Sequence, residues 1–290
     1  MNKRNGINYC EDIMMGEFTV PFKDNVIITL RRPDYLPVIK NNDKYFGGSQ
    51  MWFSANHRYG KDYILHNYGC GTIATADLFL YLAMQNSSFR TPVTDSAIIR
   101  QNGINYMDYI PYVYTIHHSY IKTKPLVTVL GPSIARAVRS YSRTYGLGLK
   151  AAWKWKLNYY DMYDRMEEML GRDLPVILSI GPNVPKLWGR KGIPFYELKE
   201  IDYLDPGAKG QEPMTEASKP YYYKTVEEGI NGHYVTVTAL IKDEVTGRIM
   251  LRISSWGKQY YINYEEYRDY IDSHSTPSTS SLVYITDKYF

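Results

Sequence analysis

The chain has little cysteine, little net charge and no long apolar run. Its two cysteines, Cys10 and Cys70, are too few for a disulfide framework, although a single bridge between them stays open. The longest apolar stretch, at 78–84, is far shorter than the ~20 residues of a membrane helix, so we expect no membrane span. The net charge of +4 is small and interspersed, which argues against a nucleic-acid partner.

The composition is otherwise that of a globular protein. Apolar residues make up 44% and charged residues 22% of the 290 positions, which argues against disorder. Tyrosine is the outlier, with 30 copies, and predicts half-buried surface such as the wall of a cleft, although a biased genome composition explains it equally well. No apolar segment follows the basic start at 1–6, so we expect a cytoplasmic protein, or a secreted one if a leader precedes this sequence.

The apolar pattern divides the chain into a helical part and a β-rich part. Residues 1–60 are rich in turn-forming residues and read as a decorated N-terminal segment. Residues 61–172 have mainly helical periodicity, and 173–290 have the short apolar runs of antiparallel strands. A stretch rich in glycine, proline and charge at 181–224 is expected to be a long loop. The pattern predicts a single α+β domain over 1–290.

Local signals predict several helices, including the following three. The dense apolar residues at 72–84 predict a central helix that is buried on most sides. A helix is expected at 97–100, capped by 94–96. Another is expected at 106–120, in which Pro111 forces a break or occupies the first turn.

Cys70 lies between Gly69 and Gly71 at the start of the predicted central helix. A thiol at a helix N-terminus feels the positive end of the dipole, which lowers its pKa and favours the nucleophilic thiolate. The glycines let the backbone turn sharply and approach a substrate closely. A small buried cysteine at a tight turn is the alternative interpretation.

His233 is the best candidate for a base among six histidines, because it begins a predicted strand. A strand start is a rigid platform for an imidazole, although a surface histidine at a turn has the same pattern. His117 and His118 are adjacent on a predicted helix and point about 100° apart, so we expect no metal site there. The Gly-Leu-Gly at 146–148 lacks the context of a phosphate loop, and no cofactor is expected.

Three short motifs then occur in order: Cys-Gly at 70–71, Gly-His at 232–233 and Ser-Ser-Trp-Gly at 254–257. Together they resemble the papain-like cysteine peptidase superfamily, most closely its bacterial branch that includes the peptidase domains of bacteriocin exporters. The resemblance covers about residues 65–85 and 173–290. It implies a papain-like α+β fold, with a helical half, an antiparallel sheet half and the cleft between them.

The resemblance also implies roles for individual residues. Cys70 matches the nucleophile, and His233 matches the general base that takes its proton. Backbone N–H groups at Cys70 and Gly71 would form part of the oxyanion hole. Trp256 matches the indole that shields the histidine's hydrogen bond from water. The orienting Asn or Asp of the family falls on Ser254, whose hydroxyl accepts a hydrogen bond but carries no charge.

A second family residue is also unmatched. The glutamine that donates to the oxyanion, a few residues before the cysteine, falls on Ile64, which cannot donate. We expect Asn67 or His66 to substitute for it. Asp243 is another candidate orienting residue, but its predicted turn lies at the far end of the strand from His233.

The resemblance implies a cysteine peptidase or amidase that hydrolyses a peptide or amide bond through a thioester acyl-enzyme. The unmatched residues support an alternative, a catalytically degenerate papain-like protein that binds peptide. An acyltransferase that uses the same Cys70 is a third reading. The expected partner is a peptide or protein substrate, and the sequence identifies neither that substrate nor the oligomeric state.

Overall fold

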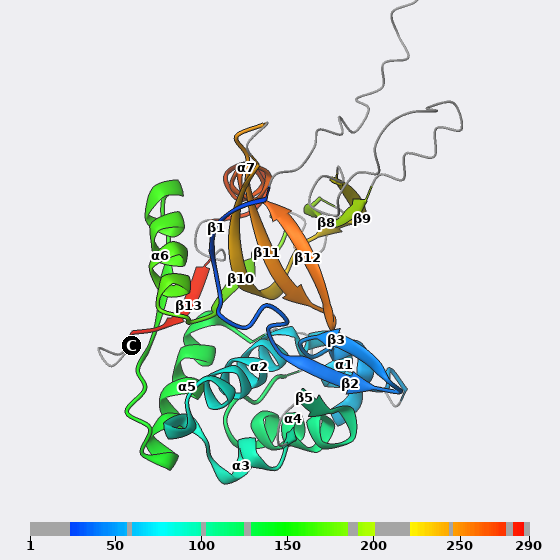
Figure 1. Ribbon diagram of the computed structural model, residues 1–290, viewed down its shortest axis with the longest axis vertical. Coiled ribbons are helices and arrows are strands. Elements are labelled where there is room, and N and C mark those ends of the chain that lie inside the picture. Colours follow the sequence, from blue (N-terminus) through cyan, green and yellow to red (C-terminus); the bar gives the residue numbers. More distant parts are fainter. Residues whose placement is uncertain are drawn as a thin grey trace, which may run out of the picture.

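The computed structural model describes residues 24–56, 60–99, 103–124, 129–184, 191–200, 221–243, 246–276 and 281–286. Over these ranges the chain has an α+β fold, as predicted, with a large antiparallel sheet and most of the helices gathered at one end of it (Figure 1). None of the helices in these ranges is long and apolar enough to cross a membrane.

The large sheet combines strands from both ends of the chain. They are β1 (Asp24–Thr29), β6 (Ala151–Trp155), β7 (Val176–Ile180), β8 (Ile193–Glu200), β9 (Tyr221–Ile230), β10 (His233–Asp243), β11 (Ile249–Ser255), β12 (Lys258–Asn263) and β13 (Ser281–Ile285). Their order is β6-β13-β7-β10-β11-β12-β8-β9. One edge of β10 pairs with β7 in its first half and with β1 in its second half, while its other edge pairs with β11. The central strand β10 is therefore held on both sides, which makes its first residue a rigid position.

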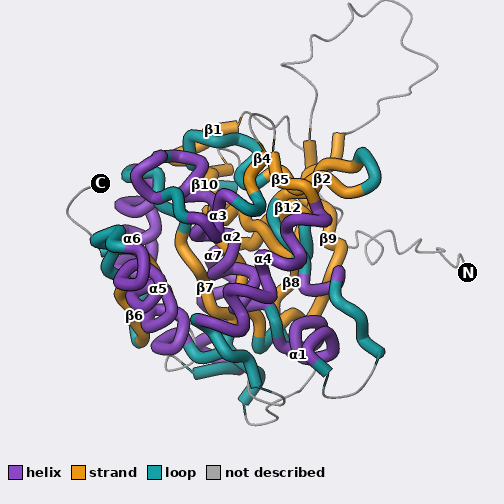
Figure 2. Tube along the Cα trace, turned by 90° about the horizontal axis from the view of Figure 1, so that it is seen from below, coloured by secondary structure: helices purple, strands orange, loops and turns teal. Residues whose placement is uncertain are grey.

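A second, small sheet has the order β3-β2-β5-β4. Its strands are β2 (Pro37–Lys40), β3 (Asp43–Phe46), β4 (Ile98–Ile99) and β5 (Gly103–Asn105). The helices are η1 (Gln50–Trp52), α1 (Lys61–Tyr68), α2 (Cys70–Gln85), η2 (Ser87–Phe89), α3 (Pro92–Asp95), α4 (Tyr106–Ser119), α5 (Gly131–Tyr145), α6 (Tyr159–Gly171) and α7 (Tyr264–His274). From the helical end, α2, α3 and α4 lie over the middle of the molecule (Figure 2). α6 packs on β1 and β10, and α7 packs on β11 and β12.

The central helix α2 agrees with the prediction. Every side chain from Cys70 to Ala83 is buried, and the helix packs on β10, α4 and α5. A helix that is apolar on all sides must be covered on all sides, and these neighbours cover it. The first turn of α2 therefore faces the start of the central strand.

Both predictions for Pro111 are wrong: the helix does not break there, and Pro111 lies in the second turn of α4 and not in the first. α4 continues unbroken through Pro111 to Ser119. A proline inside a helix removes one backbone hydrogen bond and is costly. Here the buried face of the same helix, formed by Tyr109, Tyr112, Val113 and Ile116, offsets that cost.

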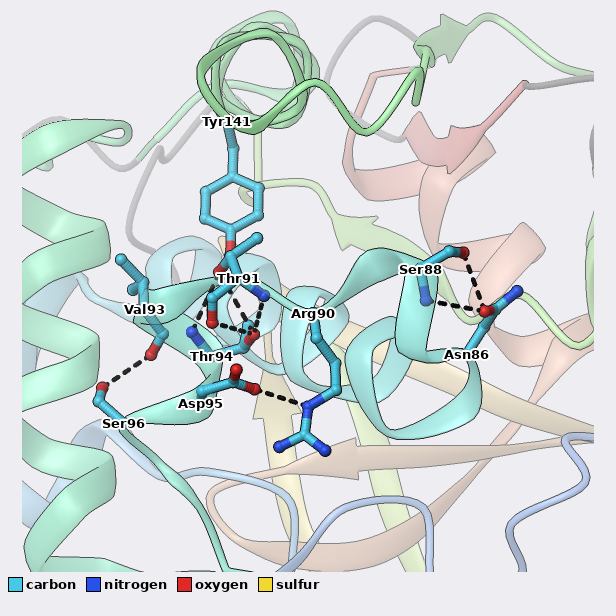
Figure 3. Close-up of polar contacts among 9 residues, drawn as sticks. All are labelled: Asn86, Ser88, Arg90, Thr91, Val93, Thr94, Asp95, Ser96 and Tyr141. Carbon is cyan, nitrogen blue, oxygen red and sulfur yellow. Dashed lines mark hydrogen bonds and ion pairs between the residues drawn. The ribbon is translucent and has the colours of Figure 1, made fainter.

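The predicted helix at 97–100 is also wrong. The helix lies earlier, as α3, and Ile98–Ile99 form β4 instead. Thr91 is the N-cap: its hydroxyl accepts from the Thr94 N–H at 3.1 Å, and the Thr94 hydroxyl accepts from the Thr91 N–H at 2.9 Å. Pro92 follows at the first helical position, which suits its fixed φ. The Thr91 hydroxyl also bonds Tyr141 Oη at 2.5 Å and so joins α3 to α5 (Figure 3).

The loop predicted at 181–224 is partly a β-hairpin. β8 and the start of β9 lie within this range and pair antiparallel with each other, and β8 extends the sheet beyond β12. Most side chains of the hairpin are only half-buried, so its sequence lacks the apolar run of a core strand. Residues 185–190 and 201–220 lie outside the described ranges.

Candidate active site

Cys70 and His233 line one small polar pocket. Its volume is about 20 Å³, which is room for about one water molecule. The lining residues come from four separate segments of the chain: Gly48 and Gln50; Cys70, Ile73, Ala74 and Asp77 of α2; His233, Tyr234 and Thr236 of β10; and Ser254, Ser255 and Trp256 at the end of β11. The fold thus brings together the three motifs that are far apart in the sequence.

Cys70 is the first residue of α2, as predicted, and Gly69 both ends α1 and caps α2. The φ of Gly69 is −83°, an ordinary value, so no unusual turn occurs there. A Cβ at Gly69 would instead lie 2.1 Å from the Leu65 carbonyl oxygen. The glycine is therefore needed for the close junction of two helices, which sets the direction of the first turn of α2.

The thiol of Cys70 is free and only 7% exposed. Burial raises its pKa, and hydrogen bonds from the backbone N–H groups of Tyr234, Gly71 and Cys70 oppose that rise only in part. The prediction of a lowered thiol pKa is wrong, because desolvation outweighs the effect of the helix terminus. The bond from Tyr234 places the sulfur beside the residue that follows His233.

His233 is the first residue of β10 and is 8% exposed. Its Nε2 lies 2.8 Å from Ser255 Oγ. Burial lowers the pKa of His233 to about 4, so the ring is neutral at pH 7. With Nε2 bonded to Ser255, Nδ1 is the ring nitrogen that remains for a base.

The predicted pairing of Ser254 with His233 is wrong. Ser254 lines the pocket, but its hydroxyl donates to the Phe46 carbonyl oxygen at 2.6 Å. Successive residues of a strand point to opposite faces, so only one of two adjacent serines faces the imidazole. That residue is Ser255. Asp243 lies at the far end of β10 from His233, as expected.

Trp256 lies against His233, where the resemblance places it. The two ring centroids are 4.7 Å apart and the planes are inclined by 27°. Trp256 and Gly257 both have positive φ, 50° and 77°, and form the two-residue turn between β11 and β12. A left-handed conformation is unfavourable for tryptophan. At this position the stacking of the indole on His233 offsets the cost.

Phe195 completes the cover of the histidine. It is fully buried on β8, with its ring centroid 5.5 Å from that of Trp256 and 6.3 Å from that of His233. Sequence reasoning missed Phe195 because its segment was assigned to a loop. The signal available was a short aromatic run, residues 195–196, inside that segment.

Gln50 is the amide side chain that lines the pocket with Cys70. Its Nε2 donates to the His66 carbonyl oxygen at 2.8 Å, and its Oε1 is buried without a hydrogen-bond partner among the described residues. The expected substitutes do not reach the pocket. Asn67 is exposed and donates to the Tyr63 carbonyl oxygen, and the ring of His66 is bonded to Phe53. Gln50 was missed because only residues close before Cys70 were considered.

Asp77 is a buried carboxyl on the same face of α2 as Cys70, two turns later. The Tyr109 hydroxyl donates to its Oδ1 at 2.6 Å, and the Gly48 N–H donates to its Oδ2 at 2.8 Å. Burial raises the pKa of Asp77 to about 7. The carboxyl thus anchors the segment that carries Gln50. Its only signal in the sequence is an acid inside an apolar helix.

The remaining sequence signals add no further site. His117 and His118 lie in the last turn of α4, and the described part of the chain contains no group of three His, Cys, Asp or Glu side chains suited to a metal ion. Cys10 lies outside the described residues. No family model and no curated protein matches the sequence. The chemistry of the site is therefore argued from its geometry and from the motifs.

Proposed function

We propose that the protein is a papain-like cysteine peptidase or amidase, with Cys70 as nucleophile and His233 as general base. The observation that carries the proposal is the shared pocket, in which a helix-terminal thiol lines the same cavity as a buried, neutral imidazole. The imidazole has an orienting hydroxyl on one nitrogen and an indole over its face. A histidine placed only for core packing does not require this combination.

The proposed reaction begins from a neutral pair. With Nε2–H donating to Ser255, Nδ1 of His233 takes the thiol proton as the sulfur of Cys70 attacks the substrate carbonyl carbon. The tetrahedral intermediate collapses when the imidazolium returns this proton to the departing amine, which leaves an acyl thioester. Water then attacks the thioester with His233 as base, and the acid and the free thiol are released.

The oxyanion of the intermediate needs donors beside Cys70. The backbone N–H of Cys70 is at the first helical position, where no carbonyl oxygen of its own helix accepts from it. Gln50 Nε2 has a second N–H beyond the one that bonds His66. We assign these two groups to the oxyanion hole, which restores the amide donor that the sequence motif lacked.

A second candidate, a degenerate protein that binds peptide without cleaving it, is favoured by one observation. The partner of the imidazole is the hydroxyl of Ser255 and not a carboxylate or carboxamide, so an imidazolium gains little stabilisation. An acyltransferase shares the site and differs only in passing the acyl group to an amine. Products formed with and without added amines separate it from a hydrolase.

The test uses a Cys10→Ala background, in which Cys70 is the only thiol. Cleavage of a peptide mixture is followed by mass spectrometry with this protein and with added Cys70→Ala or His233→Ala. Alkylation of Cys70 by iodoacetamide at pH 7.5 is measured in the same proteins. We expect cleavage only with both residues present, and slower alkylation in His233→Ala because the base is lost.

Equal cleavage by the Cys70→Ala protein contradicts the proposal. Peptide binding without cleavage, together with alkylation that is indifferent to His233, favours the degenerate binder. Circular dichroism of each variant checks that it is folded.

A further inference from the structure

A second and larger pocket, of about 350 Å³, lies beside the first turn of α2. Its walls are the segment that follows α4 and the first turns of α5. Part of the lining is apolar, from Ile121, Val129 and Leu130, and Leu130 is 60% exposed although it is a large apolar residue. The rest carries positive charge, from Lys122, Lys124 and Arg136. We name it the basic pocket.

The basic pocket is built onto the residues that follow Cys70. Thr123, between its two lysines, bonds Thr72 through their hydroxyls at 2.7 Å. Val129 packs so closely on Gly71 that a Cβ there would lie 3.2 Å from the Val129 Cβ. The wall of the basic pocket therefore contacts the two residues that follow Cys70 in the chain.

Within the part of the chain that the structure describes, the three cations of the basic pocket form no ion pair. Lys122, Lys124 and Arg136 are exposed, and no acidic residue is among the described residues that line the pocket. By contrast, the half-buried Arg165 of α6 and Arg268 of α7 each pair with an acid on their own helix. A pocket with three unpaired cations and apolar walls suits a group that is both anionic and partly apolar.

We propose that the basic pocket is a substrate subsite of the proposed cysteine peptidase and that it takes a carboxylate of the peptide. The carboxylate comes from an acidic side chain or from a free C-terminus. The methylene groups of such a residue pack against Leu130 and Val129, and the cations bind its oxygens. The assignment as a substrate subsite rests on the proposed function. The preference for a carboxylate can nevertheless be measured as binding, without catalysis.

The experiment measures binding of fluorescein-labelled hexapeptides to the Cys70→Ala protein by anisotropy. One set carries glutamate or glutamine at each position in turn, and the other has a free or an amidated C-terminus. We expect roughly threefold to tenfold tighter binding of the carboxylate form in one of the two sets, which identifies its source. The preference should shrink in 0.5 M salt, because the contacts lie near the surface.

Charge reversal at the pocket is the matched test. Arg136→Glu should abolish or invert the carboxylate preference, whereas Arg143→Glu, an exposed arginine later on the same helix and outside the pocket, should leave it unchanged. Lys122→Gln provides a second variant if Arg136→Glu lowers the thermal unfolding temperature.

Equal binding of both forms, no detectable binding of either, or a preference unaffected by both pocket variants overturns the subsite. Failure of the proposed function has a different signature. In that case the Cys70→Ala protein still distinguishes the peptides, but the protein with Cys70 cleaves none of them.

Discussion

The imidazole of His233 lies under the indole of Trp256, with the ring centroids 4.7 Å apart. Nε2 of the same imidazole lies 2.8 Å from Ser255 Oγ. Desolvation is the cause of the low pKa of His233. Trp256 is part of the cover that buries the ring, so we expect it to contribute to this desolvation.

Removal of the indole should raise the pKa of His233. We expect Trp256→Ala to move it from about 4 toward 6.5, because water regains access to the charged form. Histidine ring protons followed by NMR across pH 3 to 8 measure this, with the signal assigned from His233→Ala. Trp155→Ala, at a 40% exposed tryptophan of β6, is the control. An unchanged pKa in Trp256→Ala contradicts the shielding role.

The two adjacent serines should have separable effects. Ser255→Ala removes the partner of His233 Nε2 and should lower kcat by roughly tenfold or more, with a displaced pH–rate profile. Ser254→Ala removes only the bond to Phe46 and should cost about 1 kcal/mol of unfolding free energy with little change in kcat. Steady-state kinetics and urea unfolding of both variants give the comparison. The reverse pattern would restore the assignment made from the sequence motif.

Gln50 should act on the transition state more than on binding. Gln50→Ala removes one oxyanion donor and should lower kcat by about 100-fold while KM changes little. Gln85→Ala, at the last residue of α2, removes a similar amide that bonds Tyr81 and should leave kcat unchanged. Equal kinetics in the two variants exclude Gln50 from the oxyanion hole.

Asp77 should make the stability of the protein depend on pH. Its pKa is about 7 in the folded state and 3.8 when it is free of the fold. Between these values the folded state holds a proton that the unfolded state has released, so the contribution of Asp77 to the free energy of unfolding falls as pH rises through this window. The Asp77→Asn variant lacks this pH-dependent contribution to the free energy of unfolding. His233 has the opposite slope between about 4 and 6.5, but it is present in both proteins.

The measurement is the difference in unfolding free energy between Asp77→Asn and wild type, by urea titration at pH 5 and pH 8. We expect the difference to move in favour of the variant at pH 8, by about 2 kcal/mol. Asp108→Asn, at an exposed acid of α4, should show no such trend. A difference that is independent of pH means that Asp77 ionises freely in the fold.

Features that depend on local pattern could be predicted from the amino-acid sequence. Continuous apolar density specified α2 as a buried helix, with Cys70 as its first residue, and the run after Gly232 specified β10, with His233 at its start. The α+β class followed from the same patterns. One helix start predicted from local pattern was wrong. The N-cap was expected at 94–96, but Thr91 and Pro92 form a better helix start, and α3 begins there.

Which side chains contact one another depends on the packing of distant segments and could not be predicted from local pattern. The register of β11 directs Ser255 and not Ser254 to His233, and no local signal distinguishes two adjacent serines. Gln50 lies at the pocket because Asp77 of α2 accepts a hydrogen bond from the nearby Gly48 N–H. No sequence motif indicates this contact. Burial likewise reversed the pKa shift expected from the helix terminus, because desolvation depends on everything packed around a group and not on its own element.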